Sequence, residues 1–367
     1  MSPLTWTPRR RLHLSLFLVG ALLAFGPSGS AVPPETVPPE PAADPAPPPD
    51  PVLVGAGDIA SCDSPGDEAT AALVDQIPGT VFTAGDNAYV NGRAEEFAKC
   101  YDPTWGRFKA RTMPAPGNHE YQEDPTAAGY YGYFGAAAGD PAKGYYDYTL
   151  GSWHVIVLNS NCVRAGGCEA GSPQEQWLRQ VLAASDARCT VAITHNTRFS
   201  SALAHGSDVD LQPFWQALYE HGADLVVSGH DHVYERFAAL RPDGVPDPLF
   251  GLRQIVIGTG GRDHRSFGIP VPGSEVRIAD TFGVLKLTLR ADSYDWQFIP
   301  EAGKTLTDEG TTACHGVPPV TVPTTLLPVI EPTEVTTVTE PARRRSLRPD
   351  RLRRRASRPP MSLRAAR

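Results

Sequence analysis

Short apolar runs recur along the middle of the chain, and longer stretches with helical spacing of apolar positions separate them. The runs occupy 52–56, 80–84, 153–158, 190–194, 224–227 and 254–257. Continuous apolar runs of this length are typical of strands that are buried on both faces. Because strand and helix patterns alternate, the sequence predicts an α/β fold with a substantial parallel sheet.

Local signals place several of the helices. Apolar positions recur at helical spacing over 66–77 and 93–110. Ser172, Pro173 and Glu175 predict a helix start, with a serine cap, a proline in the first turn and a glutamate three residues after the cap. A further helix is predicted over 211–221, ending before Gly222, and the simpler alternation over 281–299 predicts antiparallel strands.

The beginning of the chain differs from this middle part. Residues 1–31 carry three arginines, an apolar stretch over 12–26 and small residues at the cleavage position, which together predict a secretory signal peptide. Arg9 and Arg10 also fit the twin-arginine export route loosely. Residues 32–51 predict a proline-rich linker, and one catalytic domain is expected over 52–316. No later apolar run is long enough for a bilayer, so the mature chain is predicted to lack a transmembrane span.

Charge is distributed unevenly along the 367 residues. The formal net charge is −8, yet 1–31 contributes +3 and 343–367 contributes +10, which leaves −21 on 32–342. The segment 317–342 predicts a linker rich in Pro, Thr and Val, and 343–367 an arginine-rich disordered tail. Two interpretations of the tail stay open, contact with a polyanion or the cell envelope, and a merely solvated end. No specific nucleic-acid site is predicted.

Residues that can bind metal ions follow five of the predicted extended segments. In chain order they are Asp58; Asp86 and Tyr89; Asn118; His195; and His230 and His232. Ligands gather at the carboxyl ends of strands in open α/β sheets, so these loops are expected to converge. Carboxylate, amide, imidazole and phenol groups suit Fe, Zn or Mn. Seven candidate ligands exceed the needs of one ion, which predicts two metals with a bridging carboxylate such as Asp86.

The ordered set Asp58, GDxxY, GNHE, His195 and GHDH resembles the motifs of the calcineurin-like metallophosphoesterases, in particular the purple acid phosphatases. The resemblance covers most of 52–300. It implies a four-layer αββα sandwich, with two mixed sheets flanked by helices, and a two-metal phosphoesterase site. The first motif, Asp58-Ile59-Ala60, lacks the histidine that most of the superfamily carries there, and Tyr89 stands where purple acid phosphatases supply a tyrosinate.

The resemblance implies a role for each motif residue. Three residues match the ligands of a first metal, namely Asp58, Tyr89 and His232. This metal is expected to be Fe(III), because a phenolate ligand favours that ion. Ligands of a second metal, Fe, Zn or Mn, match Asn118, His195 and His230, and the bridge matches Asp86.

Further residues are expected to act on the substrate. His119, and less closely His205, match histidines that face the substrate phosphate and protonate the leaving group. Glu120 is expected to orient His119 or a ligand by hydrogen bonding. Arg198 is either a phosphate contact or an ordinary surface arginine.

Six cysteines fit an exported protein and allow fifteen pairings. Cys162 and Cys168 bracket a Gly-rich loop and are the favoured pair. The other two hypothesised pairs are Cys62–Cys100 and Cys189–Cys314.

The predicted function is that of a secreted acid phosphatase-like enzyme, in which a metal-bound hydroxide attacks a small phosphate monoester. A phosphodiesterase of the same fold is the main alternative, because the same metal site serves both reactions. A non-catalytic envelope-binding protein is a further alternative, against which the complete ligand set argues.

Overall fold

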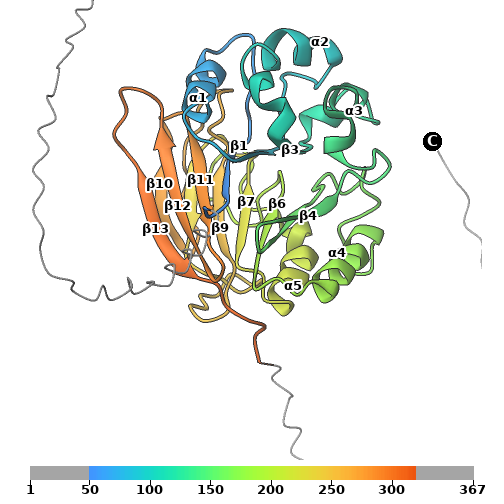
Figure 1. Cartoon of the computed structure of the whole chain (residues 1–367), viewed down its shortest axis with the longest axis vertical. Helices are drawn as coiled ribbons and strands as arrows, with labels where there is room; N and C mark the ends of the chain where they lie inside the picture. Colours follow the sequence, from blue (N-terminus) through green and yellow to red (C-terminus); the bar gives the residue numbers. More distant parts are fainter. Residues whose placement is uncertain (1–48, 320–367) are drawn as a thin grey trace, which may run out of the picture.

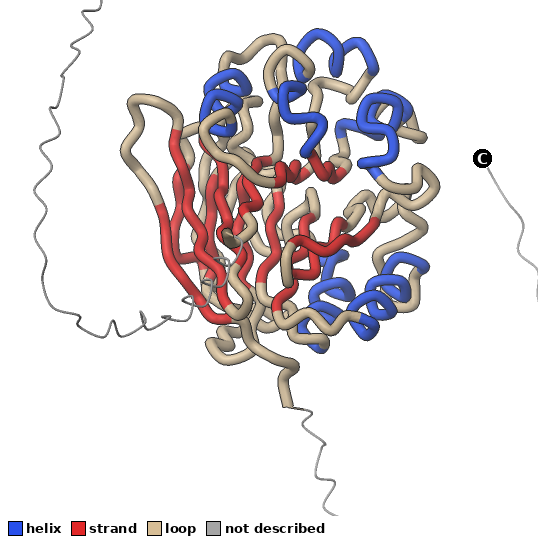
Figure 2. The backbone as a smooth tube through the Cα atoms, in the orientation of Figure 1, coloured by secondary structure: helices blue, strands red, loops and turns tan. Residues whose placement is uncertain are grey.

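Two β-sheets lie face to face in the computed structural model, which describes residues 49–319. Helices flank the pair of sheets on both outer sides (Figures 1 and 2). The predicted signal peptide, most of both linkers and the arginine-rich tail lie outside the described residues. Within 49–319, no helix has the length and hydropathy needed to cross a membrane.

The first sheet has six strands in the order β13-β12-β11-β1-β2-β3. Its parallel half consists of β1 (Val52–Ala56), β2 (Thr80–Ala84) and β3 (Thr112–Ala115). The antiparallel half comes from the end of the domain and consists of β11 (Gly283–Leu289), β12 (Ser293–Pro300) and β13 (Asp308–Ala313). The antiparallel strands predicted over 281–299 are therefore confirmed.

The second sheet has seven strands in the order β10-β8-β9-β7-β6-β5-β4. Its parallel centre consists of β5 (Trp153–Val157), β6 (Cys189–Ile193), β7 (Leu225–Ser228) and β9 (Arg253–Ile257). Antiparallel strands complete it on both sides, namely β4 (Tyr146–Leu150), β8 (Tyr234–Phe237) and β10 (Ser274–Ile278).

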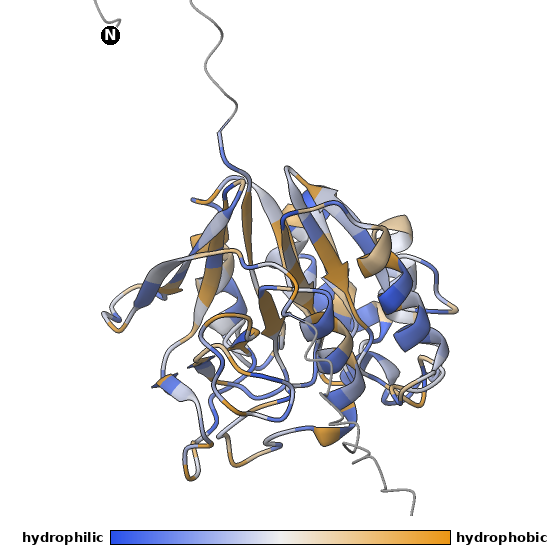
Figure 3. Cartoon of the chain, turned by 90° about the horizontal axis from the view of Figure 1, so that it is seen from below, coloured by the Kyte–Doolittle hydropathy of each residue, from blue (hydrophilic) through white to orange (hydrophobic). Residues whose placement is uncertain are grey.

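Strand β6 shows why the central strands are continuous apolar runs. Val191 and Ile193 belong to the cluster between the sheets, whereas Ala192 belongs to the cluster under the outer helices. Successive side chains of a strand point to opposite faces, so both faces of β6 are buried. Figure 3 shows hydrophobic colouring concentrated along the strands and hydrophilic colouring on much of the helical surface.

Two longer helices cover the seven-stranded sheet. They are α4 (Pro173–Ala184) and α5 (Gln212–Glu220), which pack against each other and bury residues such as Leu178 and Phe214. The predicted cap of α4 is present, because the Ser172 side chain accepts a hydrogen bond from the amide of Glu175. The other side carries α1 (Gly66–Val74), which packs on β11, and α3 (Ala128–Phe134).

The single helix predicted over 93–110 is wrong. The chain instead forms α2 (Ala94–Glu96), the π turn η1 (Phe97–Tyr101) and the 3-10 helix η2 (Trp105–Arg111). Pro103 has no amide hydrogen to donate, and Thr104 after it leaves the helical region with φ −106° and ψ −87°, so a continuous helix is interrupted there. Shorter 3-10 turns are η3 (His119–Tyr121), η4 (Gly135–Ala138) and η5 (Val209–Leu211).

Three disulfide bonds cross-link the described residues of the domain. The structure confirms the favoured pair Cys162–Cys168 and both hypothesised pairs, Cys62–Cys100 and Cys189–Cys314.

Candidate metal centre

The predicted ligands follow β1, β2, β3, β6 and β7, and the structure brings all seven together. The loops after β1 and β2 are joined by a hydrogen bond from the amide of Asp58 to the carbonyl of Gly85, 3.0 Å long. The loops after β6 and β7 are joined by a bond from the amide of Gly229 to the carbonyl of His195, also 3.0 Å long. The carboxyl ends of strands from both sheets thus form one site.

One group of donor atoms surrounds the phenol of Tyr89. Its oxygen lies 2.9 Å from Asp58 Oδ1, 2.9 Å from Asp86 Oδ2 and 3.3 Å from His232 Nε2, and its single hydrogen can be donated to either carboxylate. His232 Nε2 is in turn 3.3 Å from Asp58 Oδ1. We call Asp58, Tyr89, His232 and Asp86 Oδ2 the tyrosine set.

A second group of donor atoms surrounds His195 Nε2. It lies 3.0 Å from Asn118 Oδ1, 3.1 Å from His230 Nδ1 and 3.3 Å from Asp86 Oδ1. We call these residues the histidine set. The two oxygens of Asp86 therefore face different sets, Oδ2 the tyrosine set and Oδ1 the histidine set.

Backbone conformation marks three of these residues as unusual. Asp58, Asp86 and His230 have φ angles of 58°, 51° and 70°, and among the described residues only Ala127 shares this left-handed region without being glycine. Each such residue costs on the order of 1–3 kcal/mol and persists only where its surroundings impose it. Clustering of this cost at one site is typical of a functional centre.

The carboxylates of the site raise the pKa values of the neighbouring ligands and so keep protons on them. Burial, followed by the Asp58 and Asp86 carboxylates, raises the pKa of the Tyr89 phenol. Burial opposes protonation of His195, yet the Asp86 carboxylate prevails and raises the pKa of its imidazole to about 10. Carboxylates that hold protons on neighbouring ligands in this way fit a site built for cations, since metal binding displaces such protons.

Glycines allow the loops to approach the centre. A Cβ atom on Gly117 would lie 2.1 Å from Asp86 Oδ1, and one on Gly85 would lie 2.4 Å from His195 Nδ1. Both motifs therefore require glycine next to the ligand for steric reasons.

Glu120 holds two of the loops together, although not through His119 as the sequence left open. Its buried carboxylate accepts hydrogen bonds from the amides of Asp86 (3.0 Å), Asn87 (2.7 Å) and Gly117 (2.6 Å). Burial, followed by the charge of Asp86, raises the pKa of Glu120 to about 7. The residue thus fixes the loop that carries Asp86 against the loop that carries Asn118.

Asp263 is a residue that sequence reasoning missed. Its carboxylate accepts a hydrogen bond from Nδ1 of His232, so that Nε2 points to the tyrosine set. Such carboxylate–histidine pairs orient metal-binding imidazoles. Asp263 lies six residues after the apolar run 254–257, but no metal motif surrounds it, so the position after a predicted strand was its only signal in the sequence.

Asp231, between His230 and His232, was also given no role from the sequence. Its buried carboxylate accepts hydrogen bonds from the hydroxyl of Ser200 (2.6 Å) and from the amides of His205 and Gly206 (both 3.2 Å). The Asp231 carboxylate therefore anchors the 200–206 loop onto the GHDH motif.

The two histidines expected to face the substrate lie beside the donor sets. The ring of His119 is centred 4.6 Å from that of Tyr89, and its Nε2 is 3.7 Å from Asp86 Oδ2. The ring of His205 stacks on that of His230 at 3.9 Å. Arg198 instead donates to the side chain of Gln212 and the carbonyl of Pro242, so a phosphate contact from it finds no support.

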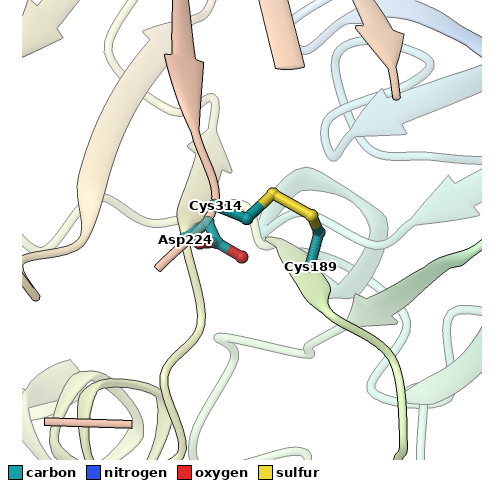
Figure 4. A group of neighbouring side chains, drawn as sticks. All are labelled: Cys189, Asp224 and Cys314. Atoms are coloured by element: carbon teal, nitrogen blue, oxygen red, sulfur yellow. A yellow bond between two sulfur atoms is a disulfide. The ribbon is translucent and has the colours of Figure 1, made fainter. Parts of the chain in front are cut away.

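A second cluster of metal-capable groups lies elsewhere and has a different character. Cys189, Cys314 and Asp224 place their side-chain atoms within 4.8 Å of one another. The two sulfur atoms are bonded to each other (Figure 4), so neither is a thiolate that could bind a metal.

A family model described as calcineurin-like phosphoesterase matches residues 50–234, just over half of the chain. The chain belongs to this family. Purple acid phosphatase 15 of Arabidopsis thaliana is 28% identical to this phosphoesterase over 228 residues, which cover 53% of the chain and 42% of the relative. An uncharacterized protein of Mycobacterium tuberculosis is 29% identical over 213 residues, which cover 50% and 40%. The chain thus spans about two fifths of the length of these curated relatives. Its similarity to purple acid phosphatases places it in the purple acid phosphatase-like branch of the family.

Solved structures agree with the fold of this phosphoesterase. The purple acid phosphatase PPD1 of yellow lupin aligns with a TM-score of 0.57 at 20% identity, over 72% of this chain and 53% of that one. GAP50, the anchor in the inner membrane complex of Plasmodium, aligns with a TM-score of 0.56 at 13% identity, over 73% and 89%. The predicted sandwich of two mixed sheets flanked by helices is confirmed.

Proposed function

We propose that this protein hydrolyses phosphate monoesters at a centre of two metal ions. The observation that carries the proposal is the position of Asp86, whose two carboxylate oxygens face two separate sets of donor atoms. If two ions are bound, a carboxylate placed in this way would be a ligand shared by both.

The donor chemistry assigns a metal to each set. Asp58, Tyr89 and His232 would hold the first ion, and the phenolate oxygen of Tyr89 favours Fe(III) there. The histidine set supplies two imidazoles, an amide oxygen and the shared carboxylate. These donors suit Fe, Zn or Mn at the second position. When bound, such a pair supplies positive charge for the phosphate and a water of lowered pKa.

His119 is placed to exchange a proton with the leaving group. The carbonyl oxygen of Val90 lies 2.5 Å from Nδ1 of His119 and can only accept, so Nδ1 carries a hydrogen. Nε2 is then the nitrogen that faces the centre, and in the imidazolium form of His119 it would pass its proton to the ester oxygen as the bond to phosphorus breaks. The amide of His119 donates to Asp86 Oδ1 over 2.9 Å, which ties this histidine to the bridging carboxylate.

His205 would assist from the side of the histidine set. Its ring is exposed to solvent and stacks on that of His230, so the other face remains open to a bound phosphate. The hydrogen bonds to Asp231 fix the backbone of His205 in this position.

The proposed compartment lies outside the cytoplasm. Three disulfides and a predicted signal peptide support export, because disulfides persist in oxidising compartments. Recovery of the protein from the extracytoplasmic fraction, cleaved near residue 31 as judged by mass spectrometry, is the expected result. An intact amino terminus in the cytoplasmic fraction would contradict it.

A phosphodiesterase is the second candidate, and the surface next to the centre is compatible with it. An open cleft of about 400 Å³ adjoins Asn118 and is lined by side chains such as Asn161, Arg164 and Asp210. It offers room for a second group esterified to the phosphate. The same cleft would also accept the leaving group of a monoester, so a direct comparison of substrates decides between them.

The deciding experiment compares the metal content and activity of the wild type with those of Asp86→Asn. Hydrolysis of a chromogenic aryl monoester and of the corresponding diester is measured at several pH values, and bound metals are counted by elemental mass spectrometry. We expect two metals per wild-type chain and faster cleavage of the monoester. Asp86→Asn should bind fewer metals and lose hydrolysis.

Asp75→Asn is the matched control, because Asp75 is a half-exposed carboxylate paired with Arg107 on the surface. It should keep both metals and full activity. Full activity of Asp86→Asn would overturn the proposed centre, and faster cleavage of the diester would transfer the proposal to a phosphodiesterase. A metal-loaded protein that cleaves neither ester would support the non-catalytic alternative.

A further inference from the structure

The loop after β9 contacts three residues of the tyrosine set, namely Asp58, His232 and Tyr89. The amide of Arg262 donates to the carbonyl of Asp58 over 3.0 Å, and the amide of Arg265 donates to the carbonyl of His232 over 3.2 Å. The GTGG sequence that opens this loop permits the approach, since a Cβ atom on Gly258 would lie 2.1 Å from the carbonyl oxygen of Asp231. The glycine run therefore serves close packing against the site.

Arg262 places a positive charge over the ring of Tyr89. Its guanidinium carbon lies 5.0 Å from the ring centroid, within the range of a cation–π contact. Nη1 of the same group donates to the hydroxyl of Ser61 over 2.8 Å, and Ser61 is only 3% exposed. The guanidinium is thereby tied to the protein above a ring that is itself 4% exposed.

A cation in this position changes the electronic properties of a tyrosine ligand. It stabilises the π electrons of the ring, and it stabilises them more when the oxygen is a phenolate than when it is a phenol. A phenolate stabilised in this way donates less charge to a metal ion, and more energy is needed to transfer an electron from the ring to that ion. Burial of the Tyr89 ring strengthens the effect, while the guanidinium of Arg262 is partly exposed and therefore partly screened by water.

We infer that Arg262 is a positioning residue that sets the donor strength of Tyr89 towards the first metal. The inference rests on the proposed function, in which Tyr89 binds Fe(III). Arg262 acts through the tyrosine ring and not on the substrate, so its effect is on the electronic state of the centre.

The test measures the visible charge-transfer band of protein loaded with Fe(III), together with its iron content. In Arg262→Gln the band should move to longer wavelength than in the wild type, because transfer from the ring then needs less energy. Arg262→Lys, which keeps a cation, should show a smaller shift in the same direction. The midpoint potential of the iron should become more negative in Arg262→Gln, since a nearby positive charge favours the reduced ion.

Arg241→Gln is the matched control, because it also replaces one arginine by glutamine and has no contact with either donor set. The side chain of Arg241 is 46% exposed and pairs with Asp243. The band of Arg241→Gln should stay at the wild-type wavelength, whereas the band of Tyr89→Phe should vanish.

A folded, iron-loaded Arg262→Gln with an unmoved band would overturn the inference alone. Bound iron without any visible band in the wild type would overturn the assignment of Tyr89 as a ligand, and the inference with it. If Arg262→Gln does not fold, Arg262→Met is measured in its place, and an unmoved maximum in that uncharged variant counts against the inference.

Discussion

Removal of the Cys189–Cys314 disulfide should destabilise this domain more than removal of any other. Cys189 begins β6 in the seven-stranded sheet, and Cys314 directly follows β13 in the six-stranded sheet, so the bond joins the two sheets. Asp224 lies beside the disulfide (Figure 4). It reinforces the same junction, because its carboxylate accepts hydrogen bonds from the amides of Thr190 and His315 over 2.9 Å and 2.8 Å.

Sequence separation sets the expected magnitude. The bond closes a loop of 125 residues, for which the chain-entropy model gives about 5 kcal/mol at 25 °C. The Cys162–Cys168 bond closes a loop of only 6 residues, for which the same model gives about 2 kcal/mol. The long bond restricts the unfolded chain more, so its loss should favour unfolding by about 3 kcal/mol more than loss of the short one.

Equilibrium unfolding in guanidinium chloride tests this difference. The double variants Cys189→Ala/Cys314→Ala and Cys162→Ala/Cys168→Ala are compared with the wild type under non-reducing conditions, and the free energy of unfolding is extrapolated to water. The short-loop variant is the control, because it also replaces two cysteines with alanine. Equal losses of stability in the two variants would refute the reasoning from loop length.

Two further predictions concern single carboxylates. Asp263→Ala should weaken metal binding at the tyrosine set by about 10- to 100-fold, because His232 loses the partner that orients it. Competition with a chelator measures the metal affinity. An unchanged affinity would show that Asp263 does not orient His232. Burial raises the pKa of Asp224 from its ordinary value of 3.8 to about 6. Folding therefore takes up a proton in this window, and the associated stability, fully present below 3.8, is lost as pH rises through about 6. The free energy of unfolding should fall less across this window in Asp224→Asn than in the wild type, and equal slopes would argue against a raised pKa.

Features that depend on neighbouring residues in the chain were predictable. The serine cap at Ser172 and the break at Gly222 are local, because they concern hydrogen bonds and backbone angles within one turn. The buried strands were predictable from their apolar runs. The prediction of one helix over 93–110 was wrong because η1 and η2 space their buried side chains almost as a single helix would. Pro103 lies between them and interrupts the hydrogen bonding.

The partners of the site were less predictable than its ligands. The motifs carry the ligand types, and Glu120 was expected to orient His119 or a ligand; which of the two, and its bonds to the amides of Asp86, Asn87 and Gly117, only the structure shows. Arg262 and Asp263 had no motif at all. Such contacts join residues far apart in the chain, and a single sequence holds no local pattern that reports them.

The sequence by itself determined the class of fold, the order of the ligand-bearing loops and the chemistry of their donors, because apolar periodicity and residue type act locally. Only the tertiary structure decided that the two oxygens of Asp86 face different donor sets, and that Arg262 lies over Tyr89. These arrangements depend on the packing of one sheet against the other and on the crossing of loops from both. Distances of a few ångströms between such loops are set by the whole core, and they decide what the centre can bind.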